Sequence, residues 1–294
     1  MKRFARLLLL SLLLLPVLTI TALADSGPKD QLIVRVENAP EEPYYLDLVT
    51  QDGDTNSLHP NLSEQELAAL DKDLLNALVA AVPEGSHACT AQGSTGAPMW
   101  GDLLGTQQDV NGNPLHQFGY FGLPDTYQIL MVTKSGETFL SEPCTRKVLQ
   151  SSVTVDWAEK TVSIPPVWVG YVLQFLSTLL PTLLIEGALL LLFGFARKKN
   201  WKPFLLINLI TQGGLALWLA INTMQHGASL WFYYLAFIPA EIIIAFVEAG
   251  LYRRFLTGRS KARAFCYGLT ANAASVLLGL WTVEPVWSFI VSLS

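Results

Sequence analysis

The chain has 294 residues, of which 51% are hydrophobic and only 15% carry a charge, with a net charge of −5. This net charge combines two opposite parts. Residues 25–164 hold 20 acidic and 7 basic side chains, whereas residues 165–294 hold 4 acidic and 9 basic ones. The acidic excess of residues 25–164 argues against nucleic acid as a partner, because like charges repel.

The first 24 residues show the three parts of a secretory signal peptide. Lys2, Arg3 and Arg6 form a basic start, residues 7–15 an apolar run, and residues 22–24 (ALA) a small-x-small cleavage site. The apolar run is too short to cross a bilayer. We therefore predict a signal peptide at 1–24 and a mature chain that begins at Asp25. An uncleaved anchor is the alternative.

Residues 25–164 are expected to form an acidic, β-rich domain outside the cytoplasm, sandwich-like and decorated by one helix. Ser63 and Glu66 form a capping box, and leucines spaced along one face extend the predicted helix over 63–82. Strands are predicted at 31–36, 44–49, 128–133, 137–140, 148–155 and 161–164, where β-branched and aromatic residues lie between turn signals.

Chemical motifs in this domain are weak. The segments at 52–56 (DGDTN) and 109–113 (DVNGN) resemble the start of a calcium loop but lack its glycine and glutamate, so we interpret them as turns. His59, His87 and His116 are scattered without the spacing of metal ligands. Asn61 with Ser63 matches an N-glycosylation acceptor, although Ser63 also fits the helix cap. We expect neither an enzyme, a bound metal nor a cofactor.

The three cysteines separate by compartment. Cys89 and Cys144 lie in the exported region, where an oxidising environment would allow a disulfide between them. Whether their side chains approach closely enough cannot be read from spacing, so both the bridge and two thiols stay open. Cys266 lies in a predicted span and is expected to be a small packing residue.

Residues 165–294 are predicted to form a bundle of four transmembrane helices. Apolar stretches at 168–196, 203–223, 230–252 and 264–283 are each long enough to cross about 30 Å of hydrocarbon. All nine basic residues of this region lie in the first and third connections, which the positive-inside rule makes cytoplasmic. The exported domain and the C-terminus then lie outside, and the chain is expected to be a multi-pass protein of the plasma membrane.

Polar residues inside the predicted spans are the most informative feature. An ionisable side chain in hydrocarbon costs at least about 2.5 kcal/mol and therefore needs partners. Helical spacing and depth predict one inward-facing cluster, formed by Glu186, Asn208, Gln212, Glu241, Glu248 and Asn272. Its oxygen and amide groups suit a proton or a hard cation. The alternative is that these groups only hold the helices together through hydrogen bonds.

Several segments resemble a group of uncharacterised bacterial membrane proteins. They are residues 118–125 (FGYFGLPD) outside the membrane, and 208–212 (NLITQ), 241–244 (EIII) and Ala271 with Asn272 inside it. Members of that group pair a signal peptide and a β-rich exported domain with a four-span unit. The resemblance implies the same architecture here and implies no activity.

Two functions follow as hypotheses. The first is a proton- or cation-coupled transport component that works through the polar cluster, with a second copy or another membrane protein as partner. The second is a surface sensor or an assembly protein that acts through the exported domain. An intramembrane enzyme ranks last, because no predicted span contains a histidine.

Overall fold

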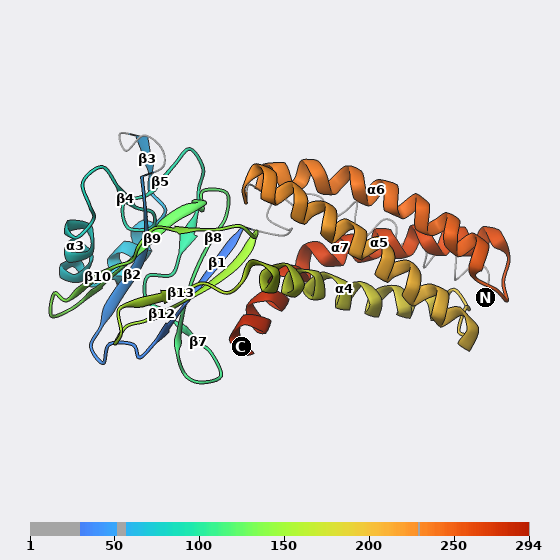
Figure 1. Ribbon diagram of the computed structural model, residues 1–294, viewed down its shortest axis with the longest axis horizontal. Helices are drawn as coiled ribbons and strands as arrows, with labels where there is room; N and C mark the ends of the chain where they lie inside the picture. Colours follow the sequence, from blue (N-terminus) through green and yellow to red (C-terminus); the bar gives the residue numbers. More distant parts are fainter. Residues whose placement is uncertain (1–29, 52–56, 229, 294) are drawn as a thin grey trace. The chain divides into compact units, whose positions relative to one another are not determined.

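The computed structural model describes residues 30–51, 57–228 and 230–293. The predicted signal peptide at 1–24, the start at Asp25 and the turn at 52–56 lie outside the described residues. The chain divides into two compact units. The sheet unit combines Lys29–Leu176, Gln212–Glu241 and Trp287–Ser294, and the described part of the hairpin unit combines Ser177–Thr211 and Ile242–Val286 (Figure 1).

Two main sheets build the sheet unit. The first has the order β13-β12-β1-β8-β6, with β7 paired to β8, and the second the order β10-β9-β2-β4, with β11 paired to β9. The small β3–β5 pair stands apart. The first sheet comprises β1 (Gln31–Glu37), β6 (Trp100–Gly101), β7 (Gln107–Gln108), β8 (Pro114–Gly119), β12 (Gln150–Asp156) and β13 (Thr161–Ser163). The others comprise β2 (Tyr44–Thr50), β3 (Leu58–His59), β4 (His87–Ala88), β5 (Ser94–Thr95), β9 (Thr126–Thr133), β10 (Thr138–Leu140) and β11 (Cys144–Thr145).

Both main sheets contribute to one hydrophobic core. Leu32 and Val34 of β1 share a buried cluster with Leu46 of β2 and with Ile129 and Met131 of β9. The six predicted strands all form, within two residues of their expected bounds. Neighbours in both sheets pair antiparallel except β1 and β12, which pair in parallel. A parallel pair requires a long connection, and most of the domain lies between these two strands.

The single helix predicted at 63–82 is wrong, because two helices form there. They are α2 (Glu64–Ala69) and α3 (Lys72–Ala80), with Leu70 extended between them. The Asp71 carboxylate accepts the backbone N–H groups of Asp73 and Leu74 and caps α3. This local bond competes with continuation of the first helix. The capping box of Ser63 and Glu66 forms as predicted.

Four long helices follow the strands: α4 (Val167–Leu192), α5 (Lys198–His226), α6 (Leu230–Phe255) and α7 (Lys261–Leu293). Among the described residues, the three segments long and apolar enough to cross a membrane are Val167–Leu192, Lys198–His226 and Phe232–Phe255. At most 33% of their most apolar windows is buried. Such outward-facing apolar surface is typical of helices in lipid. The fourth predicted span lies within α7, and its crossing stays a prediction.

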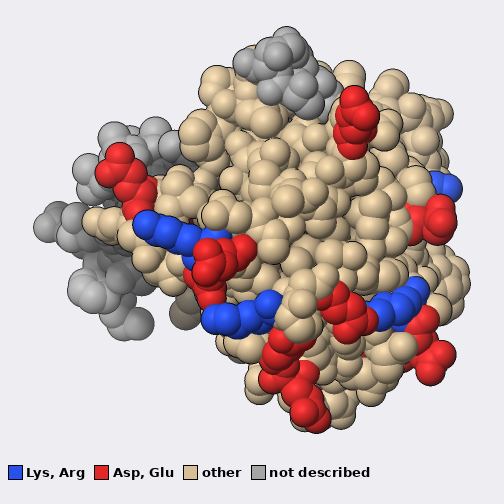
Figure 2. Space-filling model, turned by 90° about the vertical axis from the view of Figure 1, so that its left-hand side faces the viewer, with Lys and Arg blue, Asp and Glu red and all other residues tan. Residues whose placement is uncertain are grey.

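Acidic and basic side chains of the sheet unit lie next to one another rather than in separate patches (Figure 2). Exposed ion pairs join Lys134 to Asp71 and Lys160 to Glu137. The acidic excess of this unit is therefore interrupted by cations on the face that Figure 2 shows. This arrangement favours solubility over the binding of one large cationic partner.

Candidate functional site

The hairpin unit buries two carboxyl groups among neutral polar side chains. The group comprises Glu186 on α4, Asn208 and Thr211 on α5, Glu248 on α6, and Asn272 and Ser275 on α7. Thr211 is half-buried and the other five are buried. All nine basic residues of the region are exposed, so these cations keep their contact with solvent.

Each carboxyl oxygen of Glu248 contacts one polar side chain. Thr211 Oγ1 contacts its Oε1, and Asn272 Nδ2 donates to its Oε2 at 2.8 Å. The orientation of the Asn272 amide is fixed because Nδ2 also donates to the Gly268 carbonyl at 3.0 Å, and a carbonyl can only accept. Glu248 thus joins α5, α6 and α7.

Glu186 has the corresponding arrangement. Ser275 Oγ lies 3.2 Å from its Oε1, and the Tyr267 hydroxyl donates to its backbone carbonyl at 3.1 Å. Tyr267 is hydrogen-bonded to Tyr252, whose hydroxyl accepts from Asn208 Nδ2 at 2.8 Å. Both tyrosines also interact electrostatically with Glu186 and Glu248. Two acids, two tyrosines and the polar groups between them therefore form one network.

The two halves of the hairpin unit repeat one pattern. Glu248 follows Glu186 by 62 residues, Asn272 follows Asn208 by 64, and Ser275 follows Thr211 by 64. Helices α4 and α5 form the first hairpin, and α6 and α7 the second. Each hairpin thus has a glutamate on its first helix and an N-x-x-[ST] motif on its second. The contacts are reciprocal, since the hydroxyl of each hairpin lies against the glutamate of the other.

The repeat can be found in the sequence when the two halves are aligned with each other, but not when each span is considered alone. Comparing residues 177–211 with 242–286 would have paired the two N-x-x-[ST] motifs. The connections also correspond, because Gly194 and Gly258 both have positive φ angles, of 80° and 97°. Parallel internal repeats are common in membrane transporters, where binding sites lie at the interface between repeats.

Close helix packing supports the network. A Cβ atom added at Gly268 would lie 2.6 Å from Ala249 Cα, so α7 approaches α6 there at a distance that only glycine allows. Small residues such as Gly268 allow helices in a membrane to pack closely. At Gly279, an added Cβ would meet no atom within 4 Å.

Of the six residues predicted to cluster, the structure places Glu186, Asn208, Glu248 and Asn272 in the hairpin unit, connected as described above. Gln212 and Glu241 belong to the sheet unit, where Gln212 is buried and Glu241 is half-buried. Thr211, Ser275 and the two tyrosines are not among those six residues. Within the described residues no group of three or more His, Cys, Asp or Glu side chains could hold a metal ion.

The sheet unit buries its own acid beside a cation. Arg146 forms an ion pair with Asp30 and lies 3.3 Å from Asp125 Oδ1, and it also donates to backbone carbonyls. Burial raises the pKa of Asp30 to about 6, although the Arg146 charge acts in the opposite direction. Every described contact of this guanidinium is structural, so we assign it no ligand.

His116 is buried, and both of its ring nitrogens are hydrogen-bonded. Its Nδ1 must donate to the Asp102 carbonyl at 3.0 Å, so Nε2 accepts from the Tyr44 hydroxyl at 3.0 Å. Burial lowers the pKa of His116 to about 4. His59 is exposed and His87 is buried.

Cys89 and Cys144 both belong to the core cluster shared by the two sheets, and neither forms a disulfide in the structure. The bridge therefore stays a prediction. Cys266 is exposed on α7, so it is not buried packing within this chain.

The C-terminal end of α7 is held by the first sheet. Arg35 donates to the Val291 carbonyl at 2.7 Å and pairs with Asp109 at 2.9 Å, and the Val110 N–H donates to the Ser292 carbonyl at 3.1 Å. Asp109 opens the predicted turn at 109–113 and accepts two of its backbone N–H groups. A cation and an N–H group thus satisfy carbonyls that a helix leaves open.

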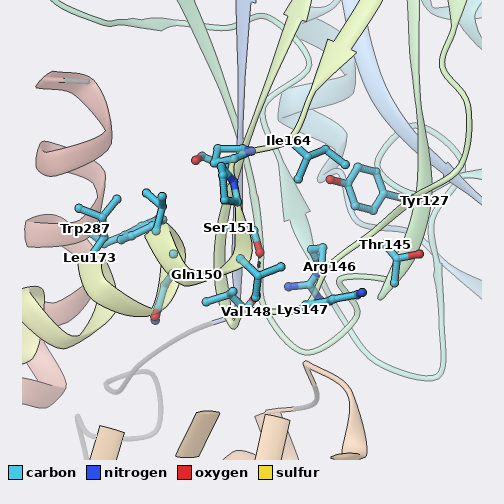
Figure 3. A pocket seen from close by; sticks show the side chains of 16 residues that line it. Tyr127, Thr145, Arg146, Lys147, Val148, Gln150, Ser151, Ile164, Leu173 and Trp287 are labelled. Atoms are coloured by element: carbon cyan, nitrogen blue, oxygen red, sulfur yellow. Dashed lines mark hydrogen bonds between the residues drawn. The ribbon is translucent and has the colours of Figure 1, made fainter. Parts of the chain in front are cut away.

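A small cavity lies in the sheet unit beside Ser151, whose hydroxyl donates to the Val148 carbonyl at 2.7 Å. Figure 3 shows Trp287 and Leu173 on one side of it and Arg146 and Thr145 on the other. Its volume of about 60 Å³ has room for a few water molecules and is far below that of a small-molecule site. We assign it no ligand.

No protein-family model matches the chain, and neither the curated proteins nor the solved structures include a match.

Proposed function

We propose that this chain is an integral membrane component of proton- or cation-coupled transport, with Glu186 and Glu248 as its ion-binding pair. The observation that carries the proposal is the reciprocal contact between hairpins, in which Thr211 meets Glu248 and Ser275 meets Glu186. Any movement that separates the hairpins breaks both contacts at once. Ion occupancy of the carboxyls and packing of the hairpins are therefore linked, as coupled transport requires.

The membrane arrangement is part of the proposal. α4, α5 and α6 are supported by length and composition, and α7 is proposed as the fourth span. The nine basic residues then face the cytoplasm, and the domain at 25–164, proposed to be a β-sandwich, lies outside the plasma membrane. Four spans are few for a solute pathway, so a second copy or another membrane protein is the proposed partner.

A sensor or assembly role is the second candidate, and the held end of α7 favours it. Arg35 and Val110 of the strand region contact the last turn of a helix that also supplies Asn272 and Ser275 to the carboxyl network. A partner that displaced Arg35 would release that turn. Arg35→Met should then change the response to such a partner while ion binding at the glutamates persists.

Flux through the reconstituted full-length chain tests the first candidate. Proteins that co-purify from the native membrane are included in a parallel set of vesicles, and internal pH and Na⁺ are followed after a gradient is imposed. We expect flux above that of empty vesicles, lost in Glu248→Gln and in Glu186→Gln. Glu241→Gln is the matched control and should retain it. Flux equal to empty vesicles in both sets would contradict transport.

A further inference from the structure

We propose that the ion bound by the hairpin unit is a proton, held on Glu248 Oε1, with Glu186 as its repeat-related counterpart. This inference deepens the proposed function and rests on it only for the claim that the proton is transported. The hydroxyl groups of Thr211 and Ser275 each have one hydrogen and more than one neighbouring oxygen.

Thr211 has one hydroxyl hydrogen and three oxygen neighbours. Its Oγ1 lies 2.8 Å from the Ile207 carbonyl, 3.2 Å from the Asn208 carbonyl and in contact with Glu248 Oε1. The two carbonyls can only accept, and an ionised carboxylate can only accept as well. If Glu248 carries a proton, its O–H donates to Thr211 Oγ1 and the Thr211 hydrogen bonds a carbonyl. Only when Glu248 is protonated can Thr211 Oγ1 hydrogen-bond both the carboxyl group and a backbone carbonyl.

The second oxygen of Glu248 identifies which oxygen carries the proton. Asn272 Nδ2 donates to Oε2, and both of its hydrogens are used, on Glu248 and on the Gly268 carbonyl. Oε2 is therefore an acceptor, which leaves Oε1 as the hydroxyl oxygen. The same geometry disfavours a cation, because Asn272 presents hydrogens to Glu248 where a hard cation would require oxygen lone pairs.

Glu186 repeats the count in the other hairpin. Ser275 Oγ lies 3.0 Å from the Asn272 carbonyl and 3.2 Å from Glu186 Oε1, again with one hydrogen for two acceptors. The longer contact to the carboxyl makes the demand for a proton weaker here than at Glu248. The two repeats thus offer two related proton sites of unequal strength.

Release of the proton requires only local rearrangement. When the Glu248 O–H bond breaks, the proton leaves, the electron pair stays on Oε1, and the Thr211 hydrogen turns from its carbonyl to the new carboxylate. The titratable groups that interact with Glu248 are Tyr252 on α6 and Tyr267 on α7, both of which also interact electrostatically with Glu186 on α4, while α5 supplies neutral Thr211 and Asn208. In the described part of the chain, buried Asn208 Oδ1 lacks a hydrogen-bond donor and gives an arriving water an acceptor one turn from Thr211.

Infrared spectroscopy of the full-length chain in lipid, with ¹³C-labelled glutamate, tests the proposal directly. We expect the carbonyl stretch of protonated glutamic acid at pH 7, a shift in D₂O, and loss of the Glu248 component of that band in Glu248→Gln. Glu241→Gln is the matched control on the same helix and should retain the band. Absence of the band from the wild type at pH 7, or an undiminished band in Glu248→Gln, would overturn the proposal.

A second variant keeps the test decisive if Glu248→Gln does not fold. Thr211→Val removes the acceptor of the proposed carboxylic O–H, so the band should shift to higher frequency. An unshifted band contradicts the hydrogen count. Added Na⁺ or Ca²⁺ at pH 7 should leave the band unchanged, and its loss would show that a cation replaces the proton. Sodium flux in the absence of the infrared band would contradict only the assignment of a proton. The band in the absence of flux would contradict only the transport function.

Discussion

The two units bury acids in different ways. In the sheet unit, Asp47 accepts backbone N–H groups from Leu48, Thr90 and Ala91. In the hairpin unit, Glu248 is contacted by side chains from α5 and α7. The difference comes from the backbone. A loop has N–H groups that are free to bond a carboxylate, whereas a helix in lipid uses its N–H groups for its own backbone hydrogen bonds. A membrane carboxyl therefore depends on a few side-chain donors, which makes its occupancy easier to change.

The largest effect is expected from a substitution that breaks the buried ion pair of the sheet unit. Arg146→Leu leaves Asp30 buried without its cation, which should cost about 3–5 kcal/mol of unfolding free energy. Lys134→Leu is the control, because the exposed Lys134–Asp71 pair should contribute at most about 1 kcal/mol. Urea unfolding of the detergent-solubilised chain, followed by protease resistance of the sheet unit, measures both. Equal losses would show that burial does not set the strength of these pairs.

The pH dependence of the sheet unit should come next in size. The pKa of His116 is lowered from 6.5 to about 4 by burial, so its contribution is present above pH 6.5 and is lost as the pH falls toward 4. That contribution is about 3 kcal/mol. His116→Gln should flatten this part of the profile in the same urea assay. An unchanged slope would contradict the buried neutral form.

Asp47 provides a control of opposite sign. Burial raises its pKa from 3.8 to about 6, against the effect of its hydrogen bonds. Its contribution is present below pH 4 and is lost as the pH rises through 6. Whatever its effect at one pH, Asp47→Asn should therefore steepen the fall in stability on acidification that His116→Gln weakens.

Helix packing in the hairpin unit gives an intermediate effect. Gly268→Ala places a methyl group against the Ala249 backbone and should destabilise the bundle by about 1–3 kcal/mol. Gly279→Ala adds the same group to the same helix in open space and should be neutral or slightly stabilising. Thermal unfolding in detergent compares the two. Similar melting temperatures for the two variants would contradict the close contact between α6 and α7 at Gly268.

The smallest expected effects test whether the two hairpins are equivalent. Thr211→Val and Ser275→Ala each remove one reciprocal contact, and hydrogen bonds in membranes average about 0.6 kcal/mol. Both single variants and the double variant are compared by thermal unfolding in detergent. A double-mutant loss unlike the sum of the singles would show that the two contacts form and break together. If only one of the two single variants lost thermal stability, the two reciprocal contacts would contribute unequally to the stability of the bundle.

The sequence determined the features that follow from local pattern. β-branched and aromatic residues between turn signals located the strands, continuous apolar stretches located α4, α5 and α6, and the basic connections between them predict sidedness. It also showed that Glu186 and Glu248 need partners, because their cost in hydrocarbon does not depend on the fold. The break at Asp71 was missed because capping and helix patterns overlap there, and only the tertiary contacts of Leu70, Leu74 and Leu78 choose between them.

Only the tertiary structure decided which polar residues meet. Glu241 and Glu248 are seven residues apart on α6, and the structure connects Glu248 to Thr211 and Asn272. Helical period fixes where side chains lie around one helix, but not which neighbour each part of that surface meets. The reciprocal contacts of Thr211 and Ser275 depend on how close the helices approach, which Gly268 permits. The contact of Arg35 with Val291 joins residues 256 positions apart, and no local pattern predicts it.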